Sequence, residues 1–202
     1  MKLDIINNGQ GRKGNKNLES LRKDAYYTYS DYVKWDDGIR YELIDGVAYM
    51  MSPAPSWIHQ EISGNLFGQL WQFLRGKPCK VYSAPFDVRL NAAQEDDTVV
   101  QPDIVVICDK SKLNDAGCAG APDMLIEILS KSSARFDKHV KLQKYLKYGV
   151  REYWIIDPDN KIVQVYTLKG DSYVVSTYDE TDEVNVTVLD GCVINLGEVF
   201  IL

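Results

Sequence analysis

Two short apolar runs near the middle of the chain constrain its fold more than any other feature. They cover residues 103–107 and 124–129, and each is of strand length with almost no polar residue. Runs of this kind are typical of central strands that are buried on both faces of a sheet. Each run nevertheless contains a carboxylate, because Asp103 opens the first and Glu127 lies inside the second.

Patterns on either side predict further helices and strands. Residues 41–50 predict a hairpin, because two strand-like segments flank the turn Asp45-Gly46. Apolar residues recur at helical spacing over 56–74, and a second long helix is expected over 134–148. A short helix is expected within 28–35, and strands are expected at 80–82, 86–90, 152–156, 162–168, 173–178, 184–189 and 193–194. This order predicts an α+β (α/β) fold in which helices flank a mixed β-sheet core.

Length and charge limit the organisation of the chain and its partners. The 202 residues fit one domain, and polar, glycine-rich residues 1–25 predict a mobile tail before a single globular domain over 26–202. The net charge of −6 argues against a protein that coats nucleic acid, although a local basic stripe could still bind phosphate.

The cysteines and the apolar segments predict the cellular compartment of the protein. The four cysteines are scattered without a Cys-x-x-Cys pair, which predicts free thiols in a reducing compartment instead of a zinc site or a disulfide framework. No apolar run is long enough to cross a membrane, and the N-terminus has no basic-then-apolar signal pattern. We therefore expect a cytoplasmic protein.

The two buried carboxylates predict a metal site. An ionised carboxylate without a partner is costly to bury, and the alternatives are a strand-edge aspartate, a solvent-facing glutamate or a glutamate paired with a cation. Together, however, Asp103 and Glu127 on neighbouring strands could hold one hard divalent cation. Mg²⁺ keeps several waters and bridges to substrate phosphate, so two protein carboxylates are enough, and Mn²⁺ is the expected substitute.

Glu42 and Lys141 are further candidates for the same site. Glu42 lies in the first strand of the hairpin, where the alternative interpretation is an exposed polar position. Lys141 belongs to a basic helix face that is usually solvated, but it shares a stripe with Tyr145 and Tyr148 at helical spacing. Its ammonium could therefore point toward the sheet, orient an attacking water and balance charge on a phosphate.

The two histidines and the remaining motifs add less evidence about the functional site. His59 opens the first long helix, where a lone histidine is more often structural than catalytic, and His139 lies among lysines and is expected to be exposed. The chain has no Gly-x-Ser-x-Gly elbow, no phosphate-binding glycine loop and no dinucleotide fingerprint.

Six segments in order along the chain resemble a known nuclease family. They are YELIDG (41–46), APFDV (84–88), VQPD (100–103), GAPD (120–123), EILS (127–130) and GVREYWIIDP (149–158). The sequence is similar to the PD-(D/E)XK nuclease superfamily and, within it, to a large bacterial family of "putative restriction endonucleases" that was formerly a domain of unknown function.

The resemblance implies a restriction-endonuclease-like core and Mg²⁺-dependent hydrolysis of phosphodiester bonds. It implies that Asp103 and Glu127 are metal ligands, with the carbonyl of Ile128 as a third, and that Glu42 is the acidic residue of the first motif. The superfamily pattern places a lysine two residues after the second acid, where this chain has Leu129. The resemblance implies that a helix lysine replaces it, and Lys141 matches by position, with Lys138 and Lys131 as weaker matches.

The sequence thus predicts a metal-dependent DNA endonuclease with Glu42, Asp103, Glu127 and Lys141 as catalytic residues. By family analogy we expect a homodimer. One alternative is a catalytically silent protein of the same fold that binds nucleic acid or protein, which Leu129 and the acidic net charge favour. Another is a hydrolase that acts on small phosphate substrates.

Overall fold

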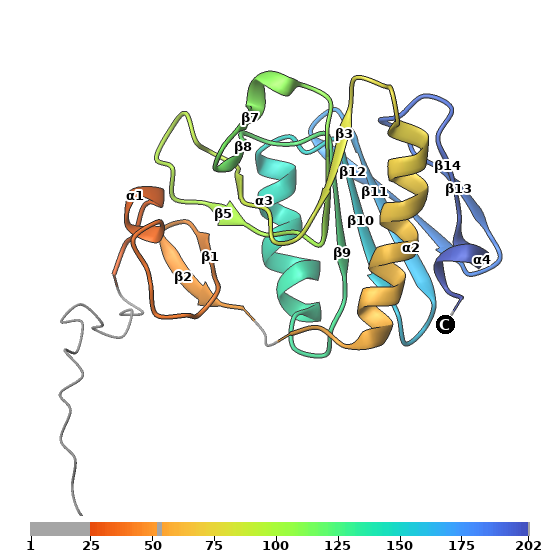
Figure 1. Cartoon of the computed structure of the whole chain (residues 1–202), viewed down its shortest axis with the longest axis horizontal. Helices are drawn as coiled ribbons and strands as arrows, with labels where there is room; N and C mark the ends of the chain where they lie inside the picture. The colour runs from red at the N-terminus through yellow and green to blue at the C-terminus, as the bar shows by residue number, and fades with distance from the viewer. Residues whose placement is uncertain (1–24, 52–53, 202) are drawn as a thin grey trace, which may run out of the picture.

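The computed structural model describes residues 25–51 and 54–201, so the expected tail over 1–25 lies outside the described residues except for Ala25. Two six-stranded sheets dominate the fold, with few helices around them, which confirms the predicted α+β class (Figure 1). Among the described residues, no helix combines the length and the apolar character needed to span a bilayer.

The larger strands form one mixed sheet in the order β12-β11-β10-β9-β6-β3. Its strands are β3 (Lys80–Ser83), β6 (Ile104–Ile107), β9 (Met124–Ile128), β10 (Glu152–Asp157), β11 (Ile162–Lys169) and β12 (Ser172–Asp179). The two apolar runs become β6 and β9, which are neighbours in this sheet and run antiparallel. β9 and β10 run parallel, as expected for strands joined through a helix.

The second sheet has the order β2-β1-β5-β4-β8-β7. Its strands are β1 (Tyr41–Ile44), β2 (Val47–Met50), β4 (Val88–Arg89), β5 (Val99–Val100), β7 (Leu113–Asn114) and β8 (Gly117–Ala119). The predicted hairpin is β1 and β2, and Asp45 and Gly46 both have positive φ, as a two-residue turn of this type requires. The predicted strand over 86–90 shortens to β4, and β5, β7 and β8 were not predicted.

Helices cover both faces of the larger sheet (Figure 1). On one face lies α2 (Trp57–Leu74), which begins after the N-cap Ser56 and buries one apolar stripe. On the other face the predicted helix over 134–148 becomes a π-helical segment, η2 (Phe136–Lys141), followed by α3 (Leu142–Lys147). The short elements are α1 (Tyr29–Tyr32), η1 (Lys110–Lys112), β13 (Glu183–Asn185), β14 (Val193–Asn195) and α4 (Leu196–Val199).

The pleat of the central strands divides the core into two clusters. Ile104 and Val106 pack on the α2 side, whereas Val105 and Ile107 pack on the side of α3. In β9, Ile126 likewise belongs to the α2 side. Because side chains alternate along a strand, Glu127 is directed to the α3 side, whereas Asp103 lies just before the start of β6.

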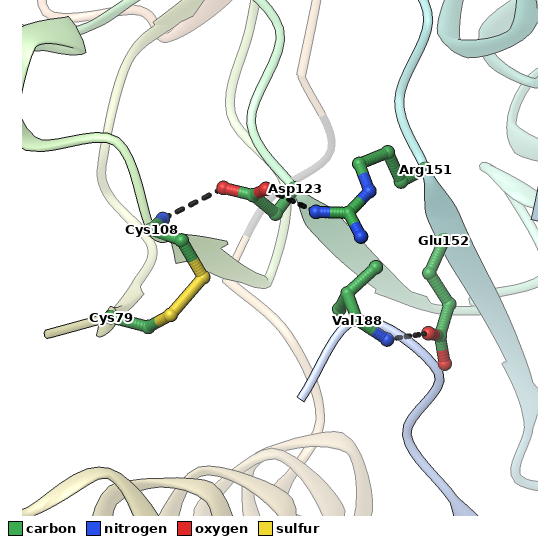
Figure 2. Close-up of a disulfide and its surroundings, with 6 residues drawn as sticks. All are labelled: Cys79, Cys108, Asp123, Arg151, Glu152 and Val188. Atoms are coloured by element: carbon green, nitrogen blue, oxygen red, sulfur yellow. Dashed lines mark hydrogen bonds and ion pairs between the residues drawn. A yellow bond between two sulfur atoms is a disulfide. The ribbon is translucent and has the colours of Figure 1, made fainter. Parts of the chain in front are cut away.

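The first residue of β10 is a buried acid with a structural role. Glu152 is fully buried, and one of its oxygens accepts a hydrogen bond from Trp154 Nε1 at 2.6 Å. The other oxygen accepts from the backbone N–H of Val188 at 3.0 Å (Figure 2). This carboxylate therefore ties the central sheet to the C-terminal segment.

The expectation of four free thiols was wrong, because Cys79 and Cys108 form a disulfide (Figure 2). The two residues flank the paired ends of β3 and β6, where Lys80 lies opposite Ile107. Antiparallel pairing brings them together although 29 residues separate them in sequence. The backbone N–H of Cys108 also donates to Asp123, which pairs in turn with Arg151. Cys118 and Cys192 are free and buried.

We predict that reducing the Cys79–Cys108 disulfide destabilises the fold. Closing a loop of this length restricts the unfolded chain and should stabilise the folded state by about 3–4 kcal/mol. A reductant should therefore lower the melting temperature by roughly 10 °C. The double variant Cys79→Ala/Cys108→Ala should melt at the lower temperature with or without reductant. Titration of four thiols in the unreduced, denatured parent would contradict the disulfide.

Candidate active site

The four predicted site residues line one cavity of about 650 Å³. Glu42 comes from β1, Asp103 precedes β6, Glu127 lies on β9 and Lys141 ends η2. Residues at the start of α2 form another wall of the cavity. The hairpin, both central strands and the helices on both faces therefore meet at this point.

Strand pairing places Asp103 beside Glu127. Ile104 lies opposite Ile126 in the antiparallel register of β6 and β9, so continuing the register by one residue sets Asp103 against Glu127. Asp103 Oδ2 accepts a hydrogen bond from the backbone N–H of Ile128 at 2.7 Å, which holds the aspartate against the end of β9. Both acids line the same cavity.

Lys141 is the centre of a buried cluster of carboxylates. Its Nζ lies 2.9 Å from Glu42 Oε1, 2.9 Å from Glu127 Oε1 and 3.3 Å from Asp137 Oδ1, and its side chain is only 5% exposed. Burial lowers the pKa of Lys141, but the attraction of Glu127, Glu42 and Asp137 outweighs burial and raises that pKa well above its usual value. The side chain therefore remains an ammonium.

Glu127 is held by two donors on one oxygen. Oε1 accepts from Lys141 Nζ at 2.9 Å and from Tyr145 OH at 3.0 Å. Burial raises the pKa of Glu127, and the neighbouring carboxylates add to this effect while Lys141 opposes it. More positive charge near Glu127 would therefore favour its ionised form.

Glu42 is buried, so the alternative of an exposed hairpin position was wrong. Its Oε1 accepts from the backbone N–H of Gln101 at 2.8 Å as well as contacting Lys141. The side-chain amide of Gln101 donates to Asp87 Oδ1 and to Tyr32 OH, both at 2.8 Å, and its carbonyl accepts from Arg40. Gln101 therefore joins Glu42 to the strand that carries Asp103.

Asp137 belongs to the cluster and was missed by sequence reasoning. It is buried, and burial is the main cause that raises its pKa, while Lys141 opposes the shift. Its Oδ1 lies near Lys141 Nζ but has no hydrogen-bond partner with acceptable geometry among the described residues. The spacing of four residues between Asp137 and Lys141 was the available signal.

His59 reaches the site from the first turn of α2. Its Nε2 lies 3.2 Å from Asp103 Oδ2. Burial lowers the pKa of His59, but the contact with Asp103 and the backbone of Ile128 outweigh this and raise it. His139 is exposed, as predicted, and the weaker lysine candidates, Lys131 and Lys138, do not line the cavity.

The donor set suits a hard cation. The hydrogen bonds that hold the two acids use Oδ2 of Asp103 and Oε1 of Glu127, and none among the described residues reaches Oδ1 or Oε2. Over residues 25–51 and 54–201, no group of three or more acidic, histidine or cysteine side chains is placed so that it could hold a metal ion. Two carboxylates and several waters are the usual arrangement for Mg²⁺.

Comparisons with known proteins give a consistent result. Residues 29–197 match the Uma2 family, described as "Putative restriction endonuclease". The uncharacterized protein slr1290 of Synechocystis is 22% identical over 160 residues, which is 77% of this chain and 82% of that protein. A crystal structure from Anabaena variabilis, described as a putative nuclease of DUF820, aligns with a TM-score of 0.69 at 21% identity, covering 86% of this chain and 97% of the other. This last likeness shows a shared fold.

We predict that Lys141→Met destabilises the protein by about 3–5 kcal/mol at pH 7, because it leaves buried carboxylates without their cation. The pKa of Glu127 in the folded variant should then lie above its unfolded value, so the deficit should shrink as pH falls from 7 to 5. Urea denaturation at pH 7 and at pH 5 measures the difference in the free energy of unfolding between the variant and the parent.

Lys138→Met is the matched control in the same helical segment. Lys138 is 38% exposed and lies 4.0 Å from Asp157, so its loss should cost less than about 1 kcal/mol. Equal stability of the two variants at pH 7 would argue against a charge cluster centred on Lys141.

Proposed function

The chain belongs to the Uma2 family, and from this membership and the geometry of the cavity we propose that it is a Mg²⁺-dependent DNA endonuclease. The observation that carries the proposal is the position of Lys141 against Glu127 and Glu42, in a cavity that Asp103 also lines. The side chain at the usual lysine position, Leu129, is buried in the apolar core. A lysine from the helix therefore supplies the ammonium that the strand lacks.

In this proposal Asp103 and Glu127 hold the metal through their free oxygens. The bound ion would lower the pKa of a water and polarise the scissile phosphate. Lys141 orients the attacking water and balances the negative charge that develops on the phosphate. Glu42 and Asp137 position Lys141, and His59 positions Asp103.

The electrostatics of the cavity support a role for a divalent cation. Among the described residues, its walls carry four carboxylates (Glu42, Asp103, Glu127 and Asp137) and two permanent cations, Arg40 and Lys141. A phosphate would meet net negative charge there, which a divalent ion would offset. We also propose a homodimer, because two copies of a single site could cut both strands, and light scattering would test the dimer.

We predict Mg²⁺- or Mn²⁺-dependent nicking of supercoiled DNA by the parent protein. Asp103→Asn, Glu127→Gln and Lys141→Met should each reduce the rate by at least about 100-fold, because each removes a ligand or a charge from the reaction centre. Isothermal titration should show that the first two variants also lose Mn²⁺ affinity.

Glu180→Gln is a suitable control, since Glu180 pairs with Lys161 far along the chain from the site residues and is 44% exposed. It should nick DNA at the parental rate. Undiminished cleavage by both Asp103→Asn and Glu127→Gln would exclude the mechanism. Mn²⁺ binding without any cleavage would instead favour a catalytically silent member of the family.

A further inference from the structure

The cavity is much larger than a metal ion and a phosphate require. Its volume of about 650 Å³ lies within the range of pockets that enclose whole small molecules. The acids, Lys141 and His59 account for one part of the lining. Another part is apolar and comes from Tyr49 and Met50 on β2, Phe67 on α2 and Phe136 on η2.

Two aromatic rings form the core of this apolar wall. The ring centroids of Tyr49 and Phe136 lie 4.8 Å apart, with the planes tilted by 48°. Tyr49 is 39% exposed and its neighbour Met50 is 71% exposed, so this wall is open to a ligand. Phe136 and Asp137 are consecutive, so the aromatic wall directly adjoins the charge cluster.

A nucleobase fits this wall better than other groups of a nucleic acid. Bases stack on exposed aromatic side chains, and this contact tolerates any base sequence. Gln60 and Ser63 line the same cavity one turn apart on α2, where an amide and a hydroxyl could bond to the edge of a base. A stacked base and its phosphate would then lie side by side, at the aromatic wall and at the carboxylates.

The charge of the cavity argues against an intact duplex as the preferred ligand. Proteins that track duplex DNA gain affinity from many lysine and arginine contacts with phosphates. Here acidic side chains outnumber basic ones in the cavity, so affinity must come largely from another source. Paired bases are stacked inside the helix and cannot enter a pocket without being unpaired.

We propose that the cavity receives one unpaired nucleotide of a DNA strand, with its base against Tyr49 and Phe136 and its phosphate at Asp103 and Glu127. This inference rests on the proposed nuclease function and specifies its substrate class. The preferred substrate is single-stranded DNA, or a duplex that carries an unpaired nucleotide.

Fluorescence anisotropy with labelled oligonucleotides tests the proposal separately from cleavage. Three probes of the same sequence are compared in Ca²⁺: a single strand, a perfect duplex and a duplex with a one-nucleotide bulge. The single strand and the bulged duplex should bind roughly tenfold or more tightly than the perfect duplex. Equal or tighter binding of the perfect duplex would overturn the proposal.

Variants of Tyr49 test the stacking contact. Tyr49→Leu, which keeps an apolar side chain but removes the ring, should weaken binding of the single strand roughly tenfold, whereas Tyr49→Phe should bind like the parent. Trp71→Ala is the control, because Trp71 is 50% exposed on α2 but does not line the cavity. Parental binding by Tyr49→Leu would refute the aromatic wall as a base site.

Two further outcomes separate this inference from the proposed function. Tight binding of the single strand without cleavage in Mg²⁺ would support the base site and refute the nuclease. Cleavage of perfect duplex at the same kcat/KM as single strand would support the nuclease and refute the base site. Competition by free dAMP at the affinity of the single strand would refute the requirement for a strand.

Discussion

The ion cluster around Lys141 is the interaction on which the centre of this structure depends. One ammonium contacts three carboxylates from three different elements, and all four groups are almost excluded from water. Each charge alone would be very costly to bury, so the members stabilise one another only when all are in place. The hairpin, the central strand β9 and the helix that follows it are therefore held together by electrostatics as well as by apolar packing.

In the proposed mechanism, this cluster supplies the ammonium that the superfamily places two residues after the second acid. Leu129 fills an apolar position on the α3 side, and the helix on that same side supplies Lys141 from 12 residues further along. The ammonium reaches Glu127 from the end of the π-helical segment, and π-helical turns are frequent at functional sites. What the chemistry requires is a cation at a point in space, and different elements can supply it.

The second feature of the cavity is the excess of acidic over basic side chains among its described lining residues. Among the described lining residues, the four carboxylates outnumber Lys141 and Arg40, so the lining is more acidic than basic. A divalent ion on Asp103 and Glu127 would offset that imbalance at the position where the scissile phosphate is proposed to bind. The neighbouring aromatic wall of Tyr49 and Phe136 offers contacts that do not depend on charge. The two parts of the cavity thus divide the recognition of a nucleotide between its phosphate and its base.

The sequence alone determined the features that depend on local pattern. The apolar runs defined β6 and β9, the Asp45-Gly46 turn defined the hairpin, and the order of these segments placed Asp103 at the start of β6 and Glu127 within β9. Only the tertiary structure decided the contacts between distant segments. It paired Cys79 with Cys108, buried Glu42 against Gln101 and brought Asp137 and His59 into the site. These outcomes depend on strand register and on how helices pack, which no short window of sequence contains because they arise from the whole fold at once.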